Sequence, residues 1–348
     1  MTSMKSVVGL QNLGLTCYGN AVLQALRHVE RVPWLLQNGR CDTLFQKETT
    51  SKRLLQQTLI TSLIDMISQQ ETGQKGSVLR PAGFWHALRA CVRNSVYDQF
   101  ILTAPHDAHE FLMCLLETLH ESTAMEVDMQ IMKSAPSNPK EERIIKALET
   151  WKTEFSKQYS PFVDLFHGLL HVQITCLRCK TISHRWETFN TLKAVVNTQS
   201  DTLYLLPAIQ KDLEGEDIEG YSCDTCSPER TIAHRSSSLW RLPQTFIVCL
   251  KRFTYDGRKI HTKVLSPQRI DVKSLFSEES PEKDGNTEYT LCAIVDHHGG
   301  SGGGHYTAQC KDKLSQHWFM YDDESAYNLD EPKFGETNYM LFYERVKK

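Results

Sequence analysis

Residues 9–20 read GLQNLGLTCYGN and stand directly before a segment with helical periodicity. In that segment, apolar residues such as Val22 and Leu26 recur at the spacing of an amphipathic helix. The pattern places Cys17 at or near the helix N-terminus, where the partial positive charge of the helix favours a thiolate, the nucleophilic form of cysteine. Asn12, on a turn flanked by glycine, could direct its side-chain amide at a developing oxyanion. The alternative is a small buried cysteine at a helix start, with Asn12 as a turn or cap residue.

A cysteine nucleophile needs a base, usually a histidine that a third polar group orients. His305 begins a predicted strand directly after the glycine-rich stretch 299–304, and a second predicted strand ends at Asp322. If the two strands pair as antiparallel neighbours, Asp322 lies beside His305 and can fix the imidazole tautomer. The alternatives are a hairpin with a polar end, or a base supplied by His297 or His298.

Four cysteines form two Cys-x-x-Cys pairs, Cys176 with Cys179 and Cys223 with Cys226, and residues 180–222 separate the pairs. Each pair turns both sulfurs toward one point, and two pairs complete a tetrahedral zinc site. Because all four positions are thiols, no coordination place stays open for catalysis. We therefore expect a structural Zn²⁺ and no organic cofactor. The alternative is a redox dithiol, for which the second pair is surplus.

The composition excludes several classes of protein. The chain has 348 residues, with 39 Lys and Arg against 42 Asp and Glu, so it lacks the basic excess of a nucleic-acid binder. Its longest apolar runs are about five residues, far below the ~20 that span a bilayer. Eleven cysteines, an odd number, in a long chain without a signal-like N-terminus indicate a reducing compartment. We expect the cytoplasm, the nucleus or both, and no nucleic-acid or membrane partner.

Helical patterns dominate the first third of the chain, at residues 18–28, 52–68 and after a capping-box-like start at Asp107. From about Pro161 the segments become short and rich in Ile, Val, Phe and Tyr, as strands are. Helices followed by strands predict an α+β fold. Two stretches are predicted as loops, the acidic residues 213–220 and the glycine-rich stretch.

The ordered set of motifs resembles the ubiquitin-specific proteases from residue 8 to about residue 344. Residues 9–20 are similar to the cysteine box of that family, and GGHYTA at 303–308 is similar to its histidine box. The blocks between them agree in order: HDAHEFL at 106–112, FHG at 166–168, the two cysteine pairs, residues 242–253, 318–323 and 338–343.

This resemblance implies a papain-like cysteine protease with a helical thumb, a β palm and zinc-bearing β fingers. It implies a single catalytic domain over residues 1–348. The thumb would take residues 1–155, the fingers and adjoining palm residues 165–250, and the rest of the palm residues 251–348. Only a few residues precede the first motif, so we expect no accessory domain on that side.

In the family pattern, Cys17 is the nucleophile, His305 the general base, Asp322 the third member of the triad and Asn12 the oxyanion donor. The resemblance also implies a set of residues that bind the substrate tail. Asp107 and Glu110 would hold the basic tail of ubiquitin, although both also fit a helix capping box. The loop and strand that close over the tail would contribute His297, Gly303, Gly304 and Tyr306.

The implied activity is hydrolysis of the isopeptide bond after the C-terminal Gly-Gly of ubiquitin, with ubiquitin and ubiquitinated proteins as partners of a monomeric enzyme. Three residues depart from the family pattern: Leu15, Gly19 and His106. None of them belongs to the triad, but they leave the modifier open. The alternatives are therefore the same chemistry on another ubiquitin-like modifier, a non-catalytic ubiquitin-binding module, or a bare zinc-ribbon scaffold.

Overall fold

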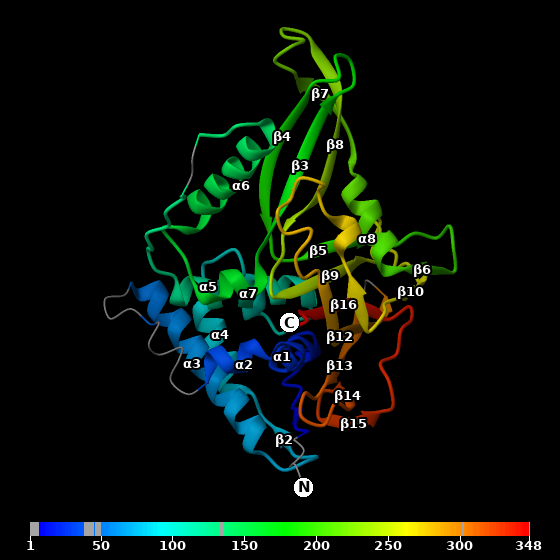
Figure 1. Cartoon of the computed structure of the whole chain (residues 1–348). Coiled ribbons are helices and arrows are strands. Elements are labelled where there is room, and N and C mark those ends of the chain that lie inside the picture. Colours follow the sequence, from blue (N-terminus) through cyan, green and yellow to red (C-terminus); the bar gives the residue numbers. More distant parts are fainter. Residues whose placement is uncertain (1–6, 38–44, 46–49, 133–134, 301–302, 348) are drawn as a thin grey trace.

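The computed structural model describes residues 7–37, 45, 50–132, 135–300 and 303–347. A group of helices packs against one large sheet, and a second, narrower sheet projects away from both (Figure 1). The fold is therefore α+β, as the sequence predicts. Among the described residues, no helix is both long and apolar enough to cross a bilayer.

The helices gather mostly in the first half of the chain. They are α1 (Cys17–His28), α2 (Arg31–Leu36), α3 (Ser51–Thr72), α4 (Ala82–Val92), α5 (Ala108–Thr123), α6 (Pro139–Phe155), α7 (Pro161–Phe166) and α8 (Leu205–Glu214), with short 3₁₀ turns η2 (Asp98–Ile101) and η3 (Lys273–Leu275). The three predicted helices are confirmed as α1, α3 and α5. The N-termini of α5 and α6 are capped by the side chains of Asp107 and Asn138, which accept backbone N–H groups of the first turn.

The large sheet has the strand order β15-β14-β13-β12-β16-β9-β5, and β11 pairs with β12. Its strands are β5 (Leu192–Val195), β9 (Thr245–Lys251), β11 (Arg269–Asp271), β12 (Glu288–Gly300), β13 (Gly303–Lys311), β14 (Trp318–Asp322), β15 (Ser325–Leu329) and β16 (Asn338–Arg345). The pairing is antiparallel except between β5 and β9. The last strand along the chain, β16, therefore lies inside the sheet between β12 and β9.

Helix α1 lies between the other helices and the sheet, and its residues from Cys17 to Arg27 are buried. One core joins apolar side chains of α1, α3, α4 and α5 to those of β12, β13 and β16, such as Val22, Phe111 and Val295. A second core covers the opposite face of the sheet, where α8 contributes Leu205 and Ile209. Burial of α1 on all sides fixes its N-terminus, and with it Cys17, against β13.

The narrow sheet forms the projecting part of Figure 1. Its antiparallel order is β4-β3-β8-β7, from β3 (Gly168–Cys176), β4 (Ile182–Phe189), β7 (Glu216–Ser222) and β8 (Arg230–Arg241). Helix α6 lies alongside it and packs Trp151 against Trp186 and Trp240. Two short parallel pairs complete the fold, β1 (Gly9–Leu10) with β2 (Val78–Leu79) and β6 (Thr202–Tyr204) with β10 (Lys263–Leu265).

The prediction of a loop at residues 213–220 is wrong. Leu213 and Glu214 end α8, and the following acidic residues form most of β7, which pairs with β8. Tertiary pairing overrides the low strand propensity of Asp and Glu. Because β7 is an edge strand, its acidic side chains face water, and charge there hinders unwanted pairing with another chain. Of the glycine-rich stretch, residues 299–300 and 303–304 extend β12 and β13, and Ser301 and Gly302 lie outside the described residues.

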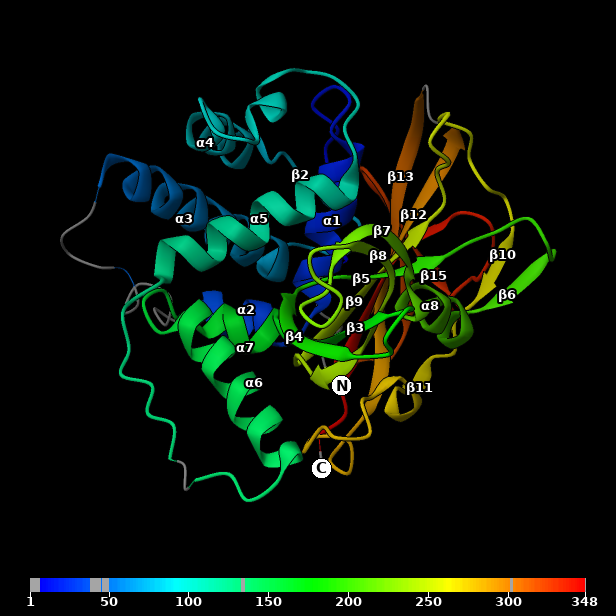
Figure 2. The same cartoon turned by 90° about the horizontal axis from the view of Figure 1, so that it is seen from above.

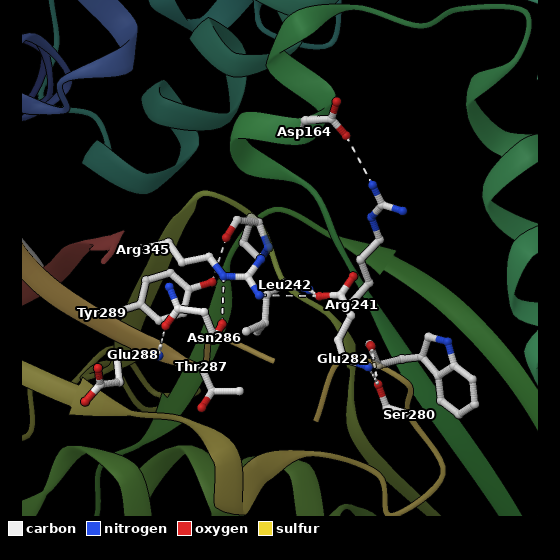
Figure 3. A network of polar contacts seen from close by, with 12 residues as sticks. Asp164, Arg241, Leu242, Ser280, Glu282, Asn286, Thr287, Glu288, Tyr289 and Arg345 are labelled. Atoms are coloured by element: carbon white, nitrogen blue, oxygen red, sulfur yellow. Dashed lines mark hydrogen bonds and ion pairs between the residues drawn. The ribbon is translucent and has the colours of Figure 1, made fainter. Parts of the chain in front are cut away.

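The end of β8 and the connection to β9 contact both α7 and the large sheet (Figure 3). On one side, Arg241 donates to Asp164 of α7 at 3.3 Å. On the other side, Glu282 accepts the backbone N–H of Leu242 at 3.1 Å and lies 3.7 Å from the guanidinium of Arg345. These contacts thus anchor the end of the narrow sheet to α7 and to β16 of the large sheet.

Candidate active site

Cys17 is the first residue of α1 and is only 8% exposed. It lies on the wall of a cavity of about 440 Å³. The helical part contributes Leu15, Tyr18 and His106 to this cavity, and the β part contributes Phe253, Gly257 and the facing ends of β12 and β13. The cavity therefore lies between the helices and the large sheet, with the candidate nucleophile at its side.

Burial raises the pKa of the Cys17 thiol above its ordinary value, and the carboxylate of Asp323 raises it further. The backbone N–H groups of Tyr306 and Tyr18 point at the sulfur and oppose this increase in the pKa. Desolvation therefore outweighs the favourable backbone dipoles of the helix N-terminus in its effect on this pKa. The contact with Tyr306 also places β13, which carries His305, directly beside the sulfur.

His305 and Asp322 meet as the strand pattern predicts. Strands β13 and β14 pair as antiparallel neighbours, with Ala308 opposite Tyr321. Nε2 of His305 lies 2.6 Å from Oδ1 of Asp322. Because the carboxylate engages Nε2, the tautomer with the proton there leaves Nδ1 free to exchange a proton with a thiol.

The two rival histidines have other surroundings. His297 is 5% exposed and packs against the rings of Phe253 and Tyr306. Burial, assisted by the charge of Lys259, lowers the pKa of His297 to about 4. His298 lies one residue further along β12, with Nε2 at 3.0 Å from the hydroxyl of Thr307. Neither ring is held by a carboxylate, whereas His305 is.

Asn12 is fixed by hydrogen bonds at both ends of its amide group. Its Nδ2 donates to Oδ2 of Asp323 at 2.8 Å, and its Oδ1 accepts the backbone N–H groups of Gly14 and Thr16 at 3.0 and 3.1 Å. Asp323 thus accepts one of the two N–H groups of the amide.

Asp323 and Asn20 are the residues that sequence reasoning missed. The second carboxylate oxygen of Asp323 accepts a hydrogen bond from Nδ2 of Asn20 at 2.8 Å. Asp323 therefore links two asparagines, one on each side of Cys17, to the end of β14. Burial raises the pKa of Asp323, although both amides counteract this rise. Asp323 directly follows β14, in a turn with a φ of +46°, and its carboxylate lies within 4.8 Å of the side-chain groups of His305 and Asp322. This placement depends on the finished fold, so no local pattern in the sequence indicates it.

Of the two acids predicted to hold a basic tail, only Asp107 lines the cavity. Its Oδ1 caps α5 by accepting the N–H groups of His109 and Glu110, and its Oδ2 accepts the hydroxyl of Tyr339 on β16 at 2.6 Å. Asp107 thereby links the helical wall to the sheet. Glu110 is exposed at the start of α5 and lies outside the cavity lining.

Of the other residues predicted to bind the tail, His297, Gly303, Gly304 and Tyr306 all line the cavity. A Cβ on Gly304 would lie 2.3 Å from Nε2 of His297, so this position has no room for a side chain. Every other amino acid has a Cβ, so the β wall of the cavity requires glycine at position 304.

Gly19, one of the departures from the family pattern, has a local explanation. A Cβ at Gly19 would lie 2.6 Å from the indole ring of Trp85. That ring packs edge-on against Tyr18 and stacks with Phe111. Trp85 thus fills the volume that a larger residue at position 19 would occupy, and the core behind the cavity stays closed.

The loop that follows β9 carries Phe253 and Gly257 to the cavity and is held by a buried arginine. Arg252 is 0% exposed and donates to backbone carbonyl groups on both sides: Nη1 to Ile260 and Thr262 at 3.1 and 2.8 Å, and Nη2 to Gly335 at 2.9 Å. These bonds fix the outer part of the loop, residues 253–262, against the segment that leads into β16.

The four cysteines of the narrow sheet come together at its tip. Their sulfurs lie within 4.8 Å of one another, with Cys176 and Cys226 at 3.9 Å and Cys179 and Cys223 at 3.5 Å. These separations exclude disulfides, in which the sulfurs are ~2.05 Å apart. Four thiolates at ~2.3 Å from a tetrahedral zinc would lie ~3.8 Å from one another, so the cluster fits that ion. The 43 residues between the pairs do not form a simple strand pair, because they include β4, β5, β6, α8 and β7.

Comparison with known proteins gives a consistent result. The sequence profile of the ubiquitin carboxyl-terminal hydrolase family matches residues 8–343. "Ubiquitin carboxyl-terminal hydrolase 4" of Arabidopsis thaliana is 30% identical over 334 residues, which cover 93% of this chain and 85% of that protein. "Ubiquitin carboxyl-terminal hydrolase 17-like protein C" of Mus musculus is 28% identical over 96% of this chain, and "Ubiquitin carboxyl-terminal hydrolase 2" of Rattus norvegicus is 26% identical over 98%. The chain spans about half the length of these two relatives, 54% of each.

Proposed function

Because the chain belongs to the ubiquitin carboxyl-terminal hydrolase family, we propose that it is a thiol-dependent deubiquitinase. Its substrate would be the isopeptide bond between the C-terminal glycine of ubiquitin and a protein lysine. The observation that carries the proposal is the pairing of His305 with Asp322 at 2.6 Å on the strand that touches Cys17. A cysteine, a histidine and a carboxylate in this order are the parts of a thiol protease.

The reaction would begin when His305 takes the proton of Cys17 and the sulfur attacks the carbonyl carbon of the terminal glycine. The oxyanion that forms would accept the remaining N–H of the Asn12 amide, whose other N–H is held by Asp323. His305 then returns the proton to the lysine Nζ, which leaves as the amine, and a thioester remains on Cys17. Water, deprotonated by His305, hydrolyses the thioester to the free ubiquitin carboxylate and restores the thiol.

Because the pKa of Cys17 is raised, we expect its proton to move to His305 only when the substrate is bound. In the free protein the neutral thiol of Cys17 is favoured. When the substrate tail displaces water and brings its carbonyl to the sulfur, attack and proton transfer to His305 can proceed together, so no stored thiolate is needed. Asp322 supports the imidazolium that forms in this step.

The cavity could take a tail that ends in two glycines, because Gly300, Gly303 and Gly304 let the backbone of its β wall approach the tail closely. Asp107 lies on the same cavity and presents a carboxylate to a basic residue upstream of the glycines. Glu110 would reach such a residue only from outside the cavity.

We further propose that Cys176, Cys179, Cys223 and Cys226 hold one structural Zn²⁺. When bound, the ion would cross-link the two turns at the tip of the narrow sheet and supply no step of the hydrolysis. We expect one zinc per chain by elemental analysis, and Cys223→Ser should lose the zinc and lower the melting temperature. Cys91→Ser, which changes a half-buried thiol outside the cluster, is the matched control and should retain the zinc.

The remaining parts of the proposal concern the molecule as a whole. The described unit would act as one catalytic domain, with the helices as thumb, the large sheet as palm and the narrow sheet as fingers. We expect it to act as a monomer on ubiquitinated proteins within the cytoplasm, the nucleus or both.

The direct test is hydrolysis of a fluorogenic C-terminal amide of ubiquitin. Wild-type protein should turn over this substrate, and Cys17→Ala should reduce kcat/KM to background. Cys249→Ala, which removes a buried thiol from another part of the same core, should retain activity. If wild-type protein is no faster than Cys17→Ala, the catalytic proposal is wrong.

Activity-based probes built from several modifiers separate the alternatives. Reaction of Cys17 with a ubiquitin probe supports the proposal. Reaction only with a probe made from another ubiquitin-like protein would assign the same chemistry to that modifier. Tight binding of ubiquitin with no labelling of Cys17 by any probe would instead indicate a non-catalytic binding module.

A further inference from the structure

Leu15 has a backbone conformation that leucine rarely adopts. Its φ angle is +57°, in the left-handed region, and it directly follows Gly14 at +95°. For a bulky L-residue this region is unfavourable, because Cβ approaches the neighbouring carbonyl oxygen. The other described non-glycine residues with positive φ are Asn94, Lys180, Gln316 and Asp323, all polar. Leu15 alone among these places a large apolar side chain on such a backbone.

Burial in the core does not offset this strain. The Leu15 side chain is 49% exposed, although it belongs to the residue type that gains most from burial. Strain that the fold does not need is found mainly at functional sites, where the surrounding structure holds the residue in place. The location of Leu15 agrees with such a role, because it lines the catalytic cavity two residues before Cys17.

The segment before α1 and the hairpin of β12 and β13 lie at the same edge of the molecule (Figure 2). On the hairpin side the cavity lining includes three glycines, Gly300, Gly303 and Gly304, which have no side chains. On the side of the nucleophile, Leu15 supplies an apolar side chain. Leu15, together with Tyr18 and Pro105 on the same side, therefore limits the space of the cavity beside Cys17.

We propose that Leu15 is a specificity-determining residue that packs against the last residue of the modifier tail and admits only a residue without Cβ. This inference rests on the proposed function, because it assigns a contact to the same cavity. In a filled apolar channel, one additional carbon typically changes kcat/KM by ~10–200-fold. Leu15 would therefore lower kcat/KM by such a factor for any tail that ends in a residue other than glycine.

The experiment compares two fluorogenic ubiquitin amides, one ending in Gly-Gly and one ending in Gly-Ala. The measured quantity is the ratio of kcat/KM for the two substrates. Leu15→Gly removes the side chain and accepts the same φ without strain. Gln316→Gly is the matched control, because Gln316 has a φ of +60° and is exposed in the connection from β13 to β14, outside the cavity lining.

Wild-type protein should prefer the Gly-Gly substrate by at least ~10-fold. Leu15→Gly should reduce this preference about tenfold, mainly through faster cleavage of the Gly-Ala substrate, and Gln316→Gly should leave it unchanged. Because glycine relieves the backbone strain, the melting temperature of Leu15→Gly should stay within about 2 °C of wild type.

An active Leu15→Gly protein with the wild-type preference would overturn the inference, because the hairpin glycines alone would then set the channel width. If Leu15→Gly does not fold, Leu15→Ala decides by the same ratio, since it shortens the side chain and retains the wild-type backbone strain. A wild-type protein that cleaves neither substrate would instead refute the proposed function, and this inference with it. If the Gly-Gly substrate is cleaved and the ratio of kcat/KM is unchanged in Leu15→Gly and Leu15→Ala, this inference is refuted and the proposed function stands.

Discussion

Asp323, which directly follows β14, binds both sides of the segment that carries Cys17. It accepts the amide N–H groups of Asn12 and Asn20 at 2.8 Å each, while Asp322, its neighbour, holds His305. Two consecutive carboxylates therefore have separate hydrogen-bond partners, with Asp322 as the last residue of β14 and Asp323 in the turn that follows it. One orients the base and the other orients the candidate oxyanion donor.

We predict that Asp323→Asn lowers kcat for a fluorogenic ubiquitin amide by roughly 10-fold or more and changes KM little. The amide at position 323 can accept only one of the two N–H groups well, so Asn12 loses its fixed orientation. The raised pKa of Asp323 means that its ionised form costs stability at neutral pH. The melting temperature should therefore not fall.

Glu324→Gln is the control for this prediction, because the Glu324 side chain accepts the backbone N–H of Asn12, at 2.9 Å, whereas Asp323 accepts the side-chain amide. It should affect kcat less than Asp323→Asn does. A loss of stability without a loss of kcat in Asp323→Asn would assign Asp323 a structural role alone.

The raised pKa of Cys17 predicts how its reactivity depends on pH in the free protein. The rate of alkylation by iodoacetamide should be low at pH 7 and should continue to rise above pH 9, because the thiolate is the reacting form. Mass spectrometry of the peptide that contains Cys17 gives this rate. A rate that is already constant below pH 7 would show a preformed ion pair with His305 and contradict the prediction.

At the scale of elements, the loop after β9 depends on one buried side chain. Arg252 donates to the carbonyl groups of Ile260, Thr262 and Gly335, and Phe253 and Gly257 of this loop line the cavity. The guanidinium presents a planar set of donors that an ammonium group cannot reproduce. Substitution should therefore loosen the loop and leave the pair of His305 and Asp322 in place.

We predict that Arg252→Lys raises KM for the ubiquitin amide by about 10-fold and lowers kcat much less, because the loop shapes the binding cavity and does not touch the reacting atoms. Arg258→Lys, an exposed change within the same loop, should leave both constants close to wild type. Steady-state kinetics with both variants tests this. An equal fall in kcat and kcat/KM for Arg252→Lys would indicate that the loop acts in the chemical step.

Local signals explain which elements the sequence could predict. The helix after Asp107 has its cap residue and its apolar stripe in adjacent positions, and the pairing of His305 with Asp322 follows from two short strands. Strand β7 has no such signal, because only its pairing with β8 overcomes the acidic composition. The link from Asn12 to Asp323 joins residues 311 positions apart, so it depends on the finished fold.

At the scale of the whole molecule, a contact between buried His171 and half-buried His184 links the narrow sheet to the segment after η3. His171 is 1% exposed, with Nδ1 at 3.0 Å from the hydroxyl of Ser277 and Nε2 at 2.9 Å from Nδ1 of His184. Burial, and then the proximity of His184, lower the pKa of His171 to about 4. The charged groups that act on this pair are Arg143, Glu279 and Lys146.

The lowered pKa of His171 predicts a loss of stability in acid. An unfolded histidine binds a proton near pH 6.5, whereas His171 in the folded chain does so only near pH 4, so the unfolded state binds more protons between these values. The free energy of unfolding should therefore decrease as the pH falls from about 6.5 to 4, by on the order of 2 kcal/mol at pH 5 from this residue alone.

His171→Phe removes the titrating group and retains a ring that can stack on Trp186. Thermal or urea unfolding at pH 7 and pH 5 should show a smaller difference between the two pH values for this variant than for wild type. His261→Phe, which changes an exposed histidine, should retain the wild-type pH dependence. Identical pH dependence in His171→Phe and wild type would contradict the assignment.

The position of β16 between β12 and β9 has a consequence for synthesis of the chain on the ribosome. Until residues 338–345 have left the exit tunnel, β12 and β9 each lack one partner and expose an unsatisfied edge. A nascent chain can form α1 and its helical neighbours early, but the sheet that carries His305 closes only when β16 is added. The proposed activity can therefore arise only after β16 has been synthesised, and chains that stop before β16 are expected to aggregate and to remain inactive.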